Sequence, residues 1–474
     1  MVGAALGTAI ALLSNMGGLP VVIGVFGGGI AVIASILAIP VALSRASSLR
    51  GRLRWYHTAW IVLFLSGLTW RVRDVSAIYS EPVDTAALVR IGLVAIVGLI
   101  AVLSTFRSGS RLIDSLTKGA VGILAAYAVF GVVSTLWSVF PAWSLYKSTE
   151  YLVDVAVAAL ILTELRDVRD TKAFADITWL MLGALVGSVW LGVLLEPELA
   201  LRTGIGVLGY QLQGVWPAVS QNGVGELGAI LGIVALSRLV SFEKGRGFYA
   251  LVLGVGVVTM LAAQSRSPIL GFALASLVVL QSLGKMSGLT FGALAAATAA
   301  LSPLGTWIEA FLRRGQSLAE IASLSGRTTI YWVRAAEVFV AHAAVGVGAY
   351  SGGRFVVIPL IGNVGGEQIG SSVDNAFIEV AISLGVMGLA LLVWTLMLVG
   401  SRLLRVGRKV RGFGVAEVLR AEALGVFILL VVRAAFSSGP VIWHPATSFL
   451  TVVVVCEMLW RVFGQPPGAE EVAA

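Results

Sequence analysis

The feature that most constrains this chain is a series of apolar runs, each about 20 residues long, that recurs along almost the whole sequence. A helix of that length spans the hydrocarbon layer of a bilayer. The runs are continuous rather than alternating, and every backbone amide in lipid needs a partner inside the protein, so the pattern favours helices over a closed barrel. Only 12% of the 474 residues are charged, which is too few to cover a soluble globule of this size. We predict an all-α polytopic membrane protein with about 12–14 transmembrane helices in a single domain over residues 1–474.

The orientation of these helices is predicted from the uneven distribution of Lys and Arg. Six connections carry 19 of them, and these are residues 45–54, 105–118, 164–172, 238–246, 281–287 and 401–411. The opposite connections carry six. Because cytoplasmic loops are enriched in Lys and Arg, we expect the first set in the cytoplasm. The net charge of +8 is therefore a topology signal, and we expect no nucleic-acid partner.

Residues 306–375 form one connection that is much longer than the others, and the charge pattern places it outside the cytoplasm. A connection of this length in a compact protein is usually functional or carries its own helices. Its stretch TTIYWVRAAEVFVAHA has helical character, with Arg327, Tyr331 and Arg334 on one face. The following GVGAYSGGRF and IGNVGGEQIGSS are glycine-rich and predict loops.

Charged residues close to a membrane are candidates for function, because burying them unpaired is costly. Four arginines and one carboxylate share the outer side, and these are Arg202, Arg266, Arg327, Arg334 and Asp374. Arginine binds phosphate through a planar, permanently charged fork, so this set suits a diphosphate substrate and a base. An arginine at this depth also commonly anchors a helix at the headgroups. Arg266 has less need of that role, because it lies in the tight turn AAQSRSP.

Asp374 and Asn375 precede an apolar helix, where Asp or Asn is an ordinary N-cap. The aspartate can also act as a general base. Glu379, further into the same helix, either pairs with an arginine or orients the site. The outer histidines His342 and His444 are alternative bases.

The sequence lacks the motifs that are typical of several classes of enzyme and of metal sites. The sequence has one cysteine, Cys456, and no HxxxH or HExxH spacing, so we expect no metal site. DxD, P-loop and GxSxG patterns are absent as well, and we expect no cofactor.

Five segments in order, over roughly residues 119–400, resemble the O-antigen ligase and polymerase superfamily of membrane glycosyltransferases. STLWSVFPAWSLYKS resembles an outer Trp-Ser turn, and Arg202 followed by SQNGVGELGAILGI resembles an Arg…Asn-x-x-Gly segment that contains Asn222. AAQSRSPILGFALA resembles a Ser-Arg turn, and SGRTTIYWVRAAEVFVAHAAVGVGAY a loop helix that ends in Gly-x-Gly. VDNAFIEVAISLGVMGL resembles a His-Asn-x-x-Leu-Glu…Gly-x-x-Gly motif, with Asp374 in place of the histidine.

This resemblance implies metal-independent, inverting transfer of a glycan from an undecaprenyl-diphosphate-linked donor to a glycan or lipid-linked glycan acceptor. The reaction would take place on the extracytoplasmic face of a bacterial inner membrane. Arg202 and Arg266 would bind the diphosphate, and Asp374 would act on the acceptor. The remaining substrate-binding candidates are Arg327, Arg334, Asn375, Glu379 and Asn222. Aspartate instead of histidine favours a polymerase, or a ligase whose acceptor is not a lipid A core.

Three other functions remain open. A transporter or flippase would show inverted repeats, interrupted helices and ionisable residues at mid-membrane. A peptidoglycan polymerase of the shape, elongation and division family also uses an outer aspartate. A non-catalytic assembly scaffold would not need outer arginines to converge.

Overall fold

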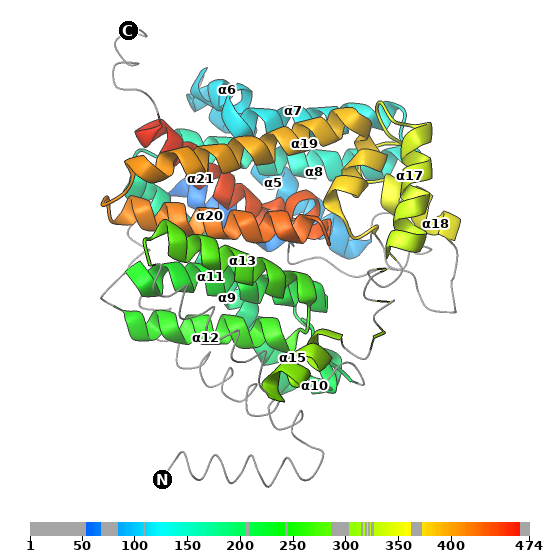
Figure 1. Ribbon diagram of the computed structural model, residues 1–474. Helices are drawn as coiled ribbons and strands as arrows, with labels where there is room; N and C mark the ends of the chain where they lie inside the picture. The colour runs from blue at the N-terminus through cyan, green and yellow to red at the C-terminus, as the bar shows by residue number, and fades with distance from the viewer. Residues whose placement is uncertain are drawn as a thin grey trace, which may run out of the picture. The chain divides into compact units, whose positions relative to one another are not determined.

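The computed structural model describes residues 54–67, 84–108, 110–203, 208–241, 245–285, 303–313, 316–317, 320, 323, 327–361 and 372–464. Within these ranges the regular secondary structure is helical apart from two three-residue strands (Figure 1). The prediction of an all-α fold is therefore confirmed.

Five of the described helices are long and apolar enough to cross a membrane. They are Thr85–Ser104, Gly119–Leu136, Val168–Leu195, Gln221–Ser241 and Ala376–Lys409. Large apolar side chains are exposed along the first of them, among them Leu88, Ile96 and Leu99, each more than half exposed. A surface of this kind suits lipid rather than water. These features are those of an integral membrane protein, and the apolar runs before residue 54 lie outside the described residues.

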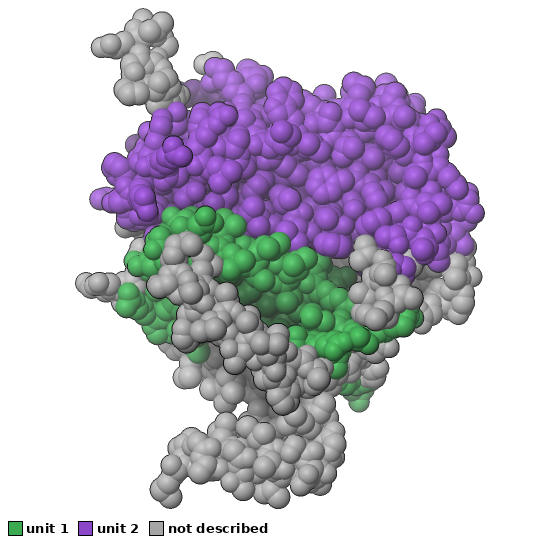
Figure 2. Space-filling model, in the orientation of Figure 1, with its two compact units in different colours: residues 1–47, 180–321 green, residues 48–179, 322–474 purple. Residues whose placement is uncertain are grey.

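The chain divides into two compact units, which Figure 2 shows in different colours. Unit 1 contains residues 1–47 and 180–321, and unit 2 contains residues 48–179 and 322–474. The helix α9, Val168–Leu195, belongs to both. The other described elements of unit 1 are α10 Pro197–Ala200, β1 Leu201–Thr203, β2 Tyr210–Leu212, α11 Gln221–Ser241, α12 Arg246–Ala262, α13 Arg266–Ser282 and α15 Pro303–Arg313.

The packing of unit 1 depends on glycine at the crossing of α11 and α12. A Cβ at Gly228 would lie 2.6 Å from the Gly256 carbonyl oxygen, and one at Gly256 would lie 2.9 Å from the Gly232 amide nitrogen. Small residues let the two backbones approach this closely, as they commonly do between helices in membranes. The strands β1 and β2 form an antiparallel hairpin in which Arg202 lies opposite Gln211.

Unit 2 carries the longest helices. Its elements are α3 Trp55–Ser66, α5 Thr85–Ser108, α6 Ser110–Thr117, α7 Gly119–Val133, η2 Ser134–Leu136, α8 Pro141–Glu164, η3 Arg327–Tyr331, α17 Trp332–Ala341, η4 Gly352–Val357, α18 Ile358–Ile361, α19 Ala376–Lys409, α20 Val415–Ala434, η5 Gly439–Trp443, η6 Pro445–Thr447 and α21 Phe449–Phe463. Every residue of α21 from Phe449 to Leu459 is buried. The helices α7, α8, α19 and α20 pack around it.

The two ends of unit 2 differ in their polar contacts. At one end, Glu457 of α21 accepts from the Ala120 amide and pairs with Arg402 of α19. At the other end lie the starts of α8 and α19, the end of α20 and the segment from 343 to 357. Here the Asn375 side-chain amide donates to the Ala435 carbonyl, and the Val139 backbone amide donates to the Val347 carbonyl. These segments include those that the charge pattern of the sequence predicts to lie on the extracytoplasmic side.

Candidate functional site

The site begins with an ion pair between two residues that the sequence nominated separately. The Arg327 Nη2 donates to the Asp374 Oδ2 at 2.8 Å. Arg327 lies in the π-helical turn η3, and Asp374 lies two residues before α19 begins. The side chains remain 26% and 38% exposed, respectively, so both are accessible to a ligand. The second carboxylate oxygen of Asp374, Oδ1, accepts from the Ser372 hydroxyl at 3.1 Å.

Of the two residues that the sequence offered as the N-cap of α19, the structure uses Asn375 and not Asp374. The Asn375 Oδ1 accepts from the Ile378 amide at 3.0 Å, and its Nδ2 donates to the Ala435 carbonyl at 2.9 Å. Asp374 has a φ of 52°, a left-handed conformation that Asp and Asn adopt more readily than most residues. Because the neighbouring asparagine caps the helix, the aspartate carboxylate points to Arg327 instead.

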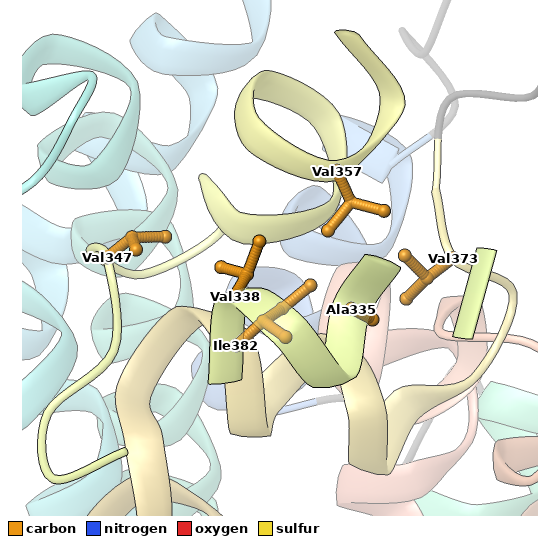
Figure 3. Close-up of a cluster of buried hydrophobic side chains, with 6 residues drawn as sticks. All are labelled: Ala335, Val338, Val347, Val357, Val373 and Ile382. Carbon is orange, nitrogen blue, oxygen red and sulfur yellow. The ribbon is translucent and has the colours of Figure 1, made fainter. Parts of the chain in front are cut away.

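A hydrophobic cluster holds both partners of this pair in place. It consists of Ala335, Val338, Val347, Val357, Val373 and Ile382, which come from α17, the turns before η4, η4 itself, the residue before Asp374 and α19 (Figure 3). The Trp332 indole also donates to the Val373 carbonyl at 3.1 Å. The backbone on either side of the Arg327–Asp374 pair is therefore fixed by contacts other than the pair.

The helix α19 is interrupted at Gly385, and a glycine-rich segment fills the break. Gly385 has a φ of 64° and a ψ of −163°, which only glycine adopts without strain. The Ile382 and Ser383 carbonyls accept from the amides of Val347 and Gly348, at 3.1 and 2.9 Å. Gly348 has a φ of 107°, and a side chain there would collide with Ser138. The two glycine motifs of the sequence thus meet in space. GVGAYS forms turns, as the sequence predicted, and is buried, whereas GGRF begins the π-helical turn η4 and is not a loop.

Glu379 lies one turn into α19 and is almost fully buried. Its Oε1 accepts from the Gly353 amide at 3.1 Å, and a Cβ at position 353 would collide with its carboxylate. Of the two roles that the sequence left open, this contact fits the orienting one, since Glu379 ties η4 to the start of α19.

A buried ionic network that the sequence did not reveal lies near this end of unit 2. Glu150 of α8 pairs through Oε1 with Arg90 of α5 and through Oε2 with Lys147 at 2.9 Å. All three side chains are at least 93% buried. Lys147 and Arg354 both lie over the rings of Trp143 and Trp443, at 5.4–5.9 Å from the ring centroids. Arg90 inside an apolar run was the signal that could have revealed this network.

His444, in the connection between α20 and α21, is a poor candidate for the base. Its burial, followed by the positive charges of Arg90 and Lys147, lowers the imidazole pKa to about 3. An imidazole with so low a pKa accepts a proton weakly at neutral pH. His342 ends α17 and is exposed.

Arg334 does not share a partner with Arg327, although the helical spacing predicted one face for both. The Arg334 Nη1 pairs with Glu337 at 2.7 Å, and both side chains are about half exposed. The π-helical turn at Arg327–Tyr331 changes the register that a continuous α-helix would have given.

Unit 1 contains Arg202, Arg266 and Asn222. Arg202 is exposed on β1. Arg266 opens α13 after a three-residue connection from α12, and it donates to the Leu312 and Arg313 carbonyls at 2.6 and 2.8 Å and to Gln316 at 2.6 Å. Asn222 accepts from the hydroxyl of Ser265, the residue before Arg266, at 2.6 Å. Arg266 therefore binds the C-terminal end of α15, a contact that the sequence did not reveal.

The structure thus groups the nominated residues into two sets. Arg327, Asp374, Asn375 and Glu379 come together in unit 2, and Asn222 and Arg266 come together in unit 1. Among the described residues, no group of three or more His, Cys, Asp and Glu side chains could hold a metal ion. No model of a known protein family matches the chain, and no curated protein matches it.

Proposed function

We propose that the protein is a membrane glycosyltransferase that joins or polymerises glycans from an undecaprenyl-diphosphate-linked donor. The observation that carries this proposal is the Arg327–Asp374 pair, which places a phosphate-binding guanidinium next to a carboxylate at a half-exposed helix junction. The five apolar helices support a membrane-bound reaction. The meeting of the two glycine motifs supports the ordered resemblance, because it brings residues about 40 positions apart into one structural element.

In the proposed reaction an acceptor hydroxyl attacks the anomeric carbon of the donor sugar. The Asp374 carboxylate takes the hydroxyl proton as the new glycosidic bond forms. The bond between the sugar and the diphosphate breaks on the opposite face, which inverts the anomeric centre. The leaving diphosphate keeps the electron pair, and the Arg327 guanidinium offsets its growing charge. The protein would have 12–14 transmembrane helices in a bacterial inner membrane. The reaction would take place on the extracytoplasmic face, where the 306–375 loop would lie.

The interruption of α19 at Gly385 is the one observation that favours a transporter, since transporters use broken helices at their binding sites. In transporters the freed carbonyls bind the substrate or a coupling ion. Here two of them, those of Ile382 and Ser383, accept from amides of the Val347–Gly348 segment. The break therefore serves internal packing, and the transferase remains the better proposal.

The test is glycan transfer by purified protein in nanodiscs, with an undecaprenyl-diphosphate-linked glycan as donor. Asp374→Asn removes the proton acceptor, while asparagine tolerates the left-handed backbone at this position. We expect turnover to fall by about 10²–10⁴-fold with little change in folding. Glu337→Gln, which removes an exposed carboxylate from α17, is the matched control and should retain turnover. Full turnover in a folded Asp374→Asn protein would exclude the aspartate as the base, and no transfer by folded wild-type protein would refute the proposed function.

A further inference from the structure

Arg327 and Asp374 form an ion pair with each other in this structure, although the proposed reaction needs Arg327 for the donor and Asp374 for the acceptor. We propose that the diphosphate of the donor takes Arg327 away from Asp374, so that binding of the donor frees the carboxylate for the acceptor. This inference rests on the proposed function and adds a preferred order of binding, donor before acceptor, to it.

The geometry of the pair permits such an exchange. The contact uses one guanidinium nitrogen of Arg327, Nη2, and one carboxylate oxygen of Asp374. A guanidinium carries five N–H donors and prefers two-point contacts with phosphate oxygens. With 26% and 38% of the side chains exposed, a part-exposed pair of this kind favours its closed form by only about 1.5- to 5-fold. A diphosphate that makes a two-point, charge-assisted contact outcompetes it.

Asp374 keeps its position when Arg327 leaves. Its Oδ1 accepts from the Ser372 hydroxyl, and its own amide donates to the same hydroxyl oxygen at 3.3 Å. The Asn375 cap and the Trp332–Val373 hydrogen bond fix the backbone on either side. The exchange therefore changes the partner of the carboxylate without moving the helix that carries it.

Direct binding of inorganic pyrophosphate to the full chain in nanodiscs tests the exchange without any need for turnover. Four proteins form a cycle: wild type, Asp374→Asn, Arg327→Gln and the double variant. If the carboxylate competes with pyrophosphate for Arg327, Asp374→Asn should bind pyrophosphate about 1.5- to 5-fold more tightly than wild type. In the Arg327→Gln background the same substitution should give no gain, because the contested guanidinium is absent.

A general electrostatic effect of removing the carboxylate predicts a different result, and the four proteins distinguish it from competition for Arg327. Removing any nearby negative charge raises affinity for an anion, but that gain would persist in the Arg327→Gln background. Asp114→Asn removes an exposed carboxylate that pairs with Lys118, a residue with no proposed role in binding, and it should leave pyrophosphate affinity within the error of wild type.

Three outcomes would overturn the exchange: a gain that persists without Arg327, no gain in Asp374→Asn, or no binding of pyrophosphate to wild type. Any of these together with normal glycan transfer would leave the proposed function standing. Loss of both pyrophosphate binding and glycan transfer in folded wild-type protein would overturn the two together.

Discussion

Glu150 offers the sharpest test of how this protein is held together, because it is the shared anion of two buried cations. Its carboxylate pairs with Arg90 of α5 through one oxygen and with Lys147 of α8 through the other. The side chains of these three residues are between 5% and 7% exposed. Glu150→Gln keeps the size of the side chain but leaves both cations without their anion.

The expected loss follows from that burial. Removing one partner of a buried ion pair costs about 3–5 kcal/mol of the free energy of unfolding, because the remaining charge cannot return to water. Asp114→Asn is the control, since Asp114 pairs with Lys118 at 2.5 Å while their side chains are 56% and 73% exposed. An exposed pair of this kind contributes about 0–1 kcal/mol.

The measurement is reversible unfolding in mixed micelles, with the helical signal as the readout. We expect Glu150→Gln to lose at least three times as much unfolding free energy as Asp114→Asn. Replacing Arg90, Lys147 and Glu150 together by apolar residues of similar volume should recover most of the loss, since no buried charge is then unpaired. Equal losses in Glu150→Gln and Asp114→Asn would refute the buried network.

Three further predictions concern single contacts. Gly385→Ala should lower the unfolding free energy by about 1–3 kcal/mol, because alanine is strained at a φ of 64° and would meet the Ala344 backbone; Gly187→Ala, where nothing lies within 4 Å, should not. Arg266→Lys should lose about 1–2 kcal/mol in thermal unfolding, because an ammonium cannot reproduce its three-acceptor contact. Asn375→Ala should lose about 1 kcal/mol by the same measurement, whereas Asn375→Asp, which keeps the cap acceptor, should lose less.

Each of these predictions can fail separately. A Gly385→Ala protein as stable as Gly187→Ala would mean that the break in α19 is not enforced by glycine. Wild-type stability in Arg266→Lys would show that position 266 supplies only charge. Equal stability of the Asn375 variants would remove the capping role.

The sequence located the junction at which α19 begins, but it could not choose between Asp374 and Asn375 as the cap. Asp and Asn are equally good caps in isolation. The choice between Asp374 and Asn375 depends on where Arg327 and Ala435 lie, and neither is close in sequence. The same limit applies to Arg266, whose acceptors at the end of α15 lie 46–50 positions away.

The sequence by itself determined that the chain is helical and suited to a membrane, because hydropathy and run length are properties of consecutive residues. It also named Arg327, Asp374, Asn375 and Glu379 as candidates from their charge beside apolar runs. Only the tertiary structure decided their partners, since Arg327 and Asp374 are 47 positions apart and Arg90 and Glu150 are 60 apart. The free energy of an ion pair depends on distance and burial, and both are set by how helices pack rather than by the order of residues along them.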